Sequence, residues 1–224
     1  YSVGYDNEET AWKAMVSDLD YSIETLTSLM NSEPGFNQLT TEDRIYGGDY
    51  KKWIKFANSL KLRIAIRISN AAPKYAQEIA EKAVSHPYGV MTSNADDAYD
   101  NLEGTNYKNG LASVNSWGEV RAFYGVRSGI RGISTSMFSN YSTVKVETKS
   151  PMLIFNASEV AFLCAEGALK KWAMGKTAKE FYEEGIRLSF AERGVSGADA
   201  YISNATRKPA DYVCPTNAAY NYSN

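Results

Sequence analysis

The chain has 224 residues, with 24 Lys or Arg against 26 Asp or Glu and a formal net charge of −2. A hydrophobic content of 44% is that of a globular protein with a real core, and this length suits one domain or two small ones. The charge balance excludes an overall field that attracts nucleic acid or an anionic membrane, which leaves only a local patch as a candidate. Apolar runs such as Met152 to Phe155 are far shorter than the roughly 20 residues of a membrane helix.

Residues 7–30 carry the apolar stripe of an amphipathic helix. Apolar positions recur there at alternating spacings of three and four, which keeps them on one helical face. They are Trp12, Met15, Val16, Leu19, Ile23, Leu26, Leu29 and Met30. The turn sequence NSEPG at 31–35 is expected to end this helix.

A second helix is predicted from YGGDYKKWIKFANSLKLRIAIRIS, residues 46–69, which holds six Lys or Arg residues. At about 100° per residue, its apolar side chains form two opposite faces, whereas its charges point in nearly every direction. One face holds Trp53, Ala57, Leu60, Ile64 and Ile68, the other Leu62 and Ile66, and the charges are Lys51, Lys52, Lys55, Lys61, Arg63 and Arg67. A nucleic-acid or membrane helix gathers its charges on one side. The pattern therefore favours an inner helix sandwiched between neighbours over a binding helix.

A third helix is predicted to start at Pro73, a residue suited to a first helical position, and to be closed by His86-Pro87. Its apolar side is Ala76, Ile79, Ala80 and Ala83. Residues 88–155 then show no sustained helical period and are rich in Gly, Asn, Ser and Tyr. A coil of that length is usually functional or disordered, and its aromatic content argues against disorder.

Helical periodicity returns at Asn156, which with Glu159 resembles a capping box, and the helix is expected to run to Gly175. Thr177 with Glu180 opens a further helix that is expected to stop at Gly194. Small residues at 167, 168, 178 and 185 allow the two helices to approach closely. The pair has about the length of a tetratricopeptide unit, although only one clear copy is apparent.

Two cysteines, Cys164 and Cys214, exclude a disulfide framework and a cysteine-rich zinc site. Cys164 lies within a helical pattern, which favours a buried free thiol over the alternative of a bridge to Cys214.

Motifs of known catalytic chemistry are weak or missing in this sequence. His86 is the single histidine and lies in the turn SHPYG, where a structural role is favoured over a place in a catalytic triad. GVRSGIRG at 125–132 has the glycines of a phosphate loop without its GK[ST] ending, and no GxSxG, HExxH or CxxC occurs. We therefore predict no catalytic residue and no cofactor.

Acidic residues between 94 and 100 invite comparison with a calcium loop. Asn94, Asp96, Asp97 and Asp100 lack the spacing of such a loop, so a solvated acidic segment is favoured and no metal is predicted. A carboxylate pair for glycoside hydrolysis stays open as an alternative, because such pairs meet in space and no particular pair is indicated.

The aromatic and amide residues of the 88–155 segment are the strongest functional signal. Flat rings stack on the apolar faces of sugars, and Asn and Arg bond hydroxyl groups, so this mixture suits a neutral polar ligand. The predicted ligand-binding residues are Trp117, Tyr124, Tyr107, Asn115, Arg121 and Arg127. The alternative is that several of these rings only pack the segment onto the helices.

Residues 46–69 resemble the central helix signature of the SusD/RagB family of outer-membrane nutrient-binding lipoproteins. The family places a tyrosine-glycine-aspartate turn before a tryptophan, a core similar to FANSLKLR and a further arginine. NEETAWKAMVSDLDYSIETL, GVRSGIRG and PMLIFNASEVAFLCAEGALKKW with TAKEFYEEGIRLSF are similar to other parts of the family in the same order. The resemblance spans nearly the whole chain.

This resemblance implies a mainly α fold in which tetratricopeptide-like helical hairpins support a long irregular loop-rich region. It also implies a non-enzymatic lipoprotein of the Bacteroidetes type, exposed on the cell outer membrane and held by a lipid anchor in the full-length protein. The implied partner is a SusC-like TonB-dependent outer-membrane transporter, which the protein covers as a lid. No ligand-binding residue is carried over, because these vary with the nutrient.

Family members are much longer than this chain, which we expect to be a central fragment. We predict a single domain over 1–224, with helices at 1–87, a loop-rich ligand region at 88–155, a helical hairpin and short helix at 156–203 and an irregular tail at 204–224. The predicted function is capture of an oligosaccharide or similar nutrient and its delivery to the transporter. The alternatives are a tetratricopeptide-like protein-interaction module and a glycoside hydrolase.

Overall fold

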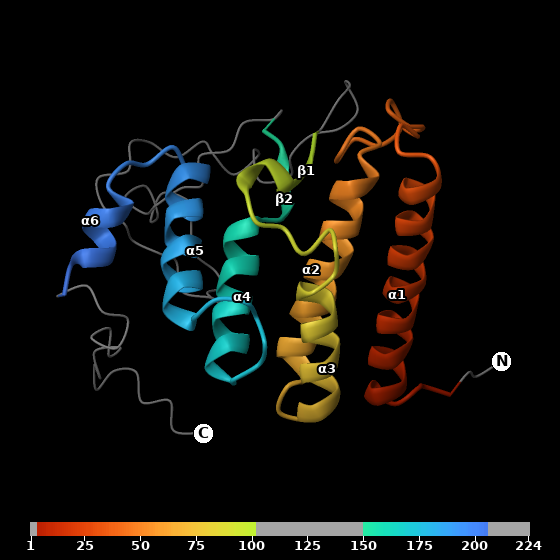
Figure 1. Cartoon of the computed structure of the whole chain (residues 1–224), viewed down its shortest axis with the longest axis horizontal. Helices are drawn as coiled ribbons and strands as arrows, with labels where there is room; N and C mark the ends of the chain where they lie inside the picture. Colours follow the sequence, from red (N-terminus) through yellow and green to blue (C-terminus); the bar gives the residue numbers. More distant parts are fainter. Residues whose placement is uncertain (1–3, 102–149, 206–224) are drawn as a thin grey trace, which may run out of the picture. The chain divides into compact units, whose positions relative to one another are not determined.

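The computed structural model describes residues 4–101 and 150–205, and in these ranges the chain is mainly helical (Figure 1). The chain forms two compact units. In the described residues, the first unit comprises 4–36, 50–97 and 156–205 and contains every α-helix, whereas the second comprises 37–49, 98–101 and 150–155 and contains two short strands. The predicted mainly α fold is confirmed.

Helix α1, Glu8–Ser32, begins and ends close to the predicted limits. The Asn7 side chain accepts a hydrogen bond from the Thr10 amide at 2.8 Å, and two glutamates in the first turn suit the positive end of the helix dipole. Val16, Ile23 and Met30 are buried, and the last two join Ile54 and Ala57 of the next helix in one hydrophobic cluster.

Helix α2, Tyr50–Ile68, is the inner helix that its two apolar faces predict. It packs against α1 on one side and against α3, Pro73–Val84, and α4, Ala157–Leu169, on others (Figure 1). Leu62 on one face and Ile64 on the other are both buried. A basic binding helix would present its charges together on a free side, whereas only Lys51 and Arg67 of α2 are exposed.

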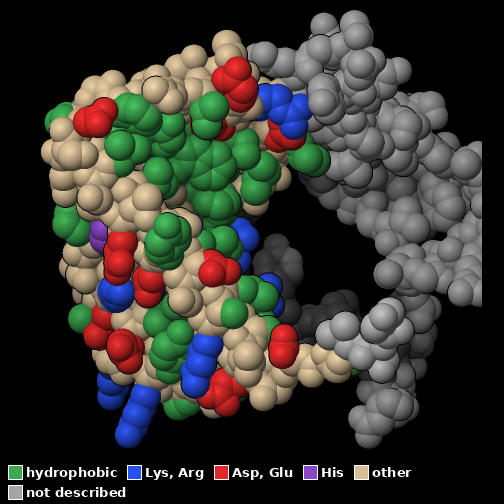
Figure 2. Space-filling view, turned by 90° about the vertical axis from the view of Figure 1, so that its right-hand side faces the viewer, with side chains coloured by type: hydrophobic (Ala, Val, Ile, Leu, Met, Phe, Trp, Pro, Cys, Tyr) green, Lys and Arg blue, Asp and Glu red, His purple; other side chains and the backbone are tan. Residues whose placement is uncertain are grey.

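The charges of α2 connect it to its neighbours. Lys61 is only 1% exposed, and its Nζ donates a hydrogen bond to the Asp20 carboxylate of α1. Arg63 donates two hydrogen bonds of 2.8 Å to Glu159 of α4. Lys55 Nζ lies 2.8 Å from Asp96 Oδ1 in the short 3-10 helix η1, Asn94–Asp96. On the face drawn in Figure 2, positive and negative side chains are interspersed and form no continuous basic area.

Helices α4 and α5, Ala178–Glu192, form the predicted hairpin. The Asn156 side chain accepts from the Glu159 amide at 3.0 Å, and Thr177 with Glu180 forms a complete capping box, as both motifs predict. A short helix α6, Ala198–Ser203, follows and packs against α5.

The end of α4 differs from the prediction, because the helix stops at Leu169 rather than at Gly175. Lys171 adopts a left-handed backbone with φ of 65°, which turns the chain back and allows Trp172 and Met174 to be buried. A Cβ atom at Gly167 would lie 2.8 Å from Met174 Sδ, so the glycine makes room for this return. Burial of the Trp172 and Met174 side chains therefore stabilises the chain more than further turns of α4 would.

The second unit contains an antiparallel pair of strands within the segment that shows no helical period. Strand β1, Ala98–Asp100, pairs with β2, Met152–Phe155, so that Ala98 faces Phe155 and Asp100 faces Met152. Arg44 Nη2 lies 3.1 Å from Asp100 Oδ2. The Asn101 side chain donates to the Arg44 carbonyl at 3.0 Å.

We expect Asp20→Ala to destabilise the protein more than Lys61→Met does. Without Asp20, the Lys61 ammonium stays buried without a carboxylate partner, which costs about 3 kcal/mol. This value lies toward the lower end of the range for buried pairs, because Asp20 is partly exposed. The methionine in Lys61→Met fills a similar volume without charge, so its free energy of unfolding should stay within about 1 kcal/mol of wild type. Urea denaturation of both variants measures the difference.

The matched control is Glu9→Ala, which breaks the exposed Lys13 to Glu9 pair within α1 and should change stability little. If Asp20→Ala and Glu9→Ala lose equally small amounts of unfolding free energy, the Lys61–Asp20 pair contributes no more than an exposed ion pair.

Candidate functional site

The six predicted ligand-binding residues lie between 102 and 149, outside the described residues. Trp117, Tyr124 and Tyr107 as a stacking platform, with Asn115, Arg121 and Arg127 as polar contacts, therefore stay a prediction. GVRSGIRG at 125–132 lies in the same range. What the structure describes are the two strands at either end of this segment and the helices of the first unit.

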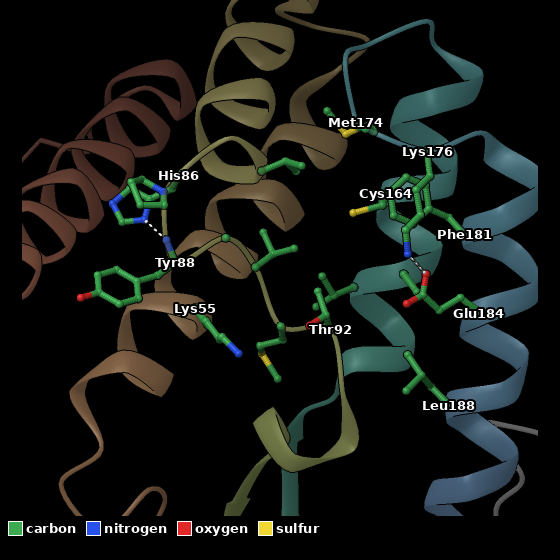
Figure 3. A pocket seen from close by; sticks show the side chains of 18 residues that line it. Lys55, His86, Tyr88, Thr92, Cys164, Met174, Lys176, Phe181, Glu184 and Leu188 are labelled. Carbon is green, nitrogen blue, oxygen red and sulfur yellow. Dashed lines mark hydrogen bonds and ion pairs between the residues drawn. The ribbon is translucent and has the colours of Figure 1, made fainter.

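The first unit contains a cleft of about 460 Å³ between the 85–92 loop and the α4–α5 hairpin. Figure 3 shows His86, Tyr88 and Thr92 on the loop side, and Cys164, Met174 and Phe181 on the hairpin side. The lining mixes apolar side chains with two lysines, Lys55 and Lys176, and one glutamate, Glu184. Its volume lies in the range of small-molecule pockets.

His86 holds the loop in place rather than acting as a base. Its Nδ1 accepts a hydrogen bond from the Tyr88 amide at 3.2 Å, and its Nε2 lies 3.4 Å from Thr27 Oγ1. Burial lowers the pKa of His86, and the charges of Lys61 and Lys82 lower it further. Both ring nitrogens are occupied and the neutral form is favoured, as expected for a turn histidine.

Cys164 is a buried free thiol, and Cys214 lies outside the described residues. Burial raises the pKa of Cys164 to about 12, with a smaller contribution from Glu184. The thiol is therefore protonated and weakly nucleophilic at neutral pH.

The charged groups of the cleft are paired with each other or with neighbours. Lys176 Nζ donates to Glu184 Oε2 at 2.6 Å and lies 5.5 Å from the centre of the Phe181 ring. Lys55 is paired with Asp96. Together with the protonated Cys164, these pairings leave the lining residues without a nucleophile and base positioned for catalysis. The cleft can hold a small, largely apolar molecule.

The acidic residues of the 94–100 segment are directed to separate partners. Asp96 accepts from Lys55 and from the Thr92 and Ser93 amides, Asp97 accepts from the Ala157 amide, and Asp100 pairs with Arg44. Over residues 4–101 and 150–205, no three His, Cys, Asp or Glu side chains gather in a metal-binding arrangement.

Comparison with known proteins places this mainly helical chain in one family. The family model described as SusD-like, SusD and RagB outer membrane lipoprotein, matches residues 1–123 and 120–224. No curated protein matches the chain. Within the described ranges, no helix combines the length and apolar character needed to cross a membrane.

Solved structures agree with the family model. A SusD-like protein from Bacteroides thetaiotaomicron is 42% identical, with a TM-score of 0.80 over 90% of this chain and 48% of its own. A chitin-binding SusD homologue from Flavobacterium johnsoniae is 32% identical, with a TM-score of 0.83 over 91% of this chain and 48% of its own. A SusD homologue from Bacteroides uniformis is 36% identical, with a TM-score of 0.80 over 91% and 48%.

The chain belongs to the SusD/RagB family of outer membrane lipoproteins, as its α2 signature predicts. It spans about half the length of the solved relatives that it matches.

Cys164 should resist alkylation in the folded protein. With a pKa of about 12, only a fraction on the order of 10⁻⁴ of this thiol is ionised at about pH 8, and the side chain is buried as well. Iodoacetamide labelling followed by mass spectrometry of the Cys164 peptide should show modification only in denaturing urea, which also serves as the control. Rapid labelling of the native protein would show that the cleft opens to solvent.

Proposed function

We propose that the protein captures an oligosaccharide or similar oligomeric nutrient at the cell surface and delivers it to a SusC-like TonB-dependent transporter. Family membership over the whole chain carries this proposal. The chitin-binding relative covers 91% of this chain, which supports a glycan as the ligand class. In this proposal the full-length protein is held on the outer membrane by a lipid anchor.

The proposed ligand platform is the aromatic segment that lies between β1 and β2 in the sequence. Trp117, Tyr124 and Tyr107 would stack on sugar rings, and Asn115, Arg121 and Arg127 would bond hydroxyl groups. Antiparallel pairing of β1 with β2 brings the two ends of this segment together, so rigid elements support its base. The division into helices at 1–87 and 156–203, a ligand region at 88–155 and a tail at 204–224 belongs to the same proposal.

Binding without turnover is the expected activity. The cleft lining lacks a positioned nucleophile and base, and the family that the chain matches is one of outer membrane lipoproteins. Incubation with the bound glycan should therefore release no shorter product, and product release would instead support the glycoside hydrolase alternative.

Trp117→Ala and Tyr124→Ala should each weaken glycan binding by about fivefold, because loss of one stacked ring removes on the order of 1 kcal/mol. Isothermal titration calorimetry of the full-length protein, with a ligand selected from a polysaccharide panel, measures the change.

Tyr182→Ala is the matched control, since this aromatic ring is exposed on α5 and lies outside the proposed platform. Unchanged affinity in Trp117→Ala and Tyr124→Ala would refute the platform. Loss of affinity in Tyr182→Ala alone would favour a helical interaction surface, as in the tetratricopeptide-like alternative.

A further inference from the structure

The chain leaves the first unit after Asp97 and re-enters it at Asn156. These two points are joined directly, because Asp97 Oδ1 accepts a hydrogen bond of 2.7 Å from the amide of Ala157, the first residue of α4. The neighbouring residues of the second unit are Ala98, after Asp97, and Phe155, before Asn156. They pair with each other in the β1–β2 ladder. Asp97 thus lies where the chain leaves the first unit, before the part of the sequence that contains all six predicted ligand residues.

Asp97 is only 8% exposed, and its surroundings are acidic. On the α5 side is Glu192, whose carboxylate accepts from Asn156 Nδ2 at 2.9 Å, and the preceding residue in η1 is Asp96. The neighbouring cations are held by other carboxylates: Lys55 of α2 by Asp96, Arg63 of α2 by Glu159 of α4, and Arg193, which follows α5, lies 3.6 Å from Glu192.

Burial raises the pKa of Asp97 from its ordinary value of 3.8 to about 6. The hydrogen bond from Ala157 opposes this rise, whereas Glu192 and Asp96 add to it. A raised carboxyl pKa means that the folded arrangement binds the proton more tightly than the opened one. Its contribution to stability is therefore complete below about pH 4 and is lost as the pH rises to about 6.

We propose that Asp97 is a proton-controlled latch between the chain at residue 97 and the start of α4. Its neutral carboxyl group holds the contact with Ala157, and ionisation of the carboxyl group weakens this contact. The neutral acid removes the repulsion by Glu192 and Asp96 and leaves a carbonyl oxygen that still accepts from Ala157. The contact between Asp97 and the first residue of α4 is therefore firmer at about pH 5 than at about pH 7.5. This latch is independent of which ligand, if any, the segment binds.

Amide hydrogen exchange on the unliganded protein tests the latch. Protection of the Ala157 amide and of the β1 and β2 amides, corrected for the intrinsic pH dependence of exchange, should fall about tenfold between about pH 5 and about pH 7.5. Amides of buried α1 residues such as Val16 should keep their protection, which separates local opening from global unfolding.

Asp97→Asn preserves the acceptor oxygen without the charge and should abolish the pH dependence, while Glu192→Gln should reduce it. Asp18→Asn, on the exposed side of α1, should retain the wild-type profile. The latch is refuted if wild-type protection at Ala157 does not fall with pH, or if Asp97→Asn retains the wild-type profile. Should Asp97→Asn fail to fold, an undiminished pH response in Glu192→Gln would refute it instead.

Discussion

The buried ammonium group of Lys61 is the constraint on which the helical unit depends. At 1% exposure, this charge requires a carboxylate in contact, and Asp20 on α1 supplies it. Asp20 also accepts from Lys82 of α3 at 3.2 Å, so a single carboxylate links three helices. Arg63 extends the same arrangement to α4 through Glu159. Ion pairs thereby connect α2 with α1 and α4, and α3 with α1.

Such pairs define an arrangement more than they add net stability, because desolvation offsets much of their attraction. Burial raises the pKa of Asp20, but the hydrogen bonds and charges of Lys61 and Lys82 outweigh it, and the pKa is lowered overall. Because a lowered carboxyl pKa favours the ionised folded state, this contribution is present above the ordinary pKa and is lost as the pH falls below it. Asp20 and Asp97 therefore respond to acid in opposite directions.

Periodicity and capping were sufficient to predict much of the helical unit. The two apolar faces of α2, the stripe of α3 and the caps of α4 and α5 all depend on residues three or four apart, which are neighbours on one helix. Burial of Lys61 depends instead on a carboxylate 41 positions away on α1, which a helical wheel does not contain. The early end of α4 likewise depends on packing of Trp172 and Met174 against Gly167.

The candidate site was less accessible to sequence reasoning. Composition indicated an aromatic segment, but without a helical period nothing placed individual rings, so the ligand residues remain predictions. In the sequence Asp97 is only one member of an acidic run, whereas its raised pKa arises from burial and from Glu192, which is far along the chain. The resemblance to SusD/RagB proteins, carried by residues 46–69, was the stronger guide, and it came from a helix that forms the core.

Helix α2 lies in the core of the helical unit, and we propose that ligand is bound instead by the segment between β1 and β2. Amide hydrogen exchange with and without saturating glycan tests this claim most directly. We expect bound glycan to increase protection within 102–149 and to leave the amides of α2 unchanged. Increased protection confined to α2 and its neighbouring helices would contradict the account.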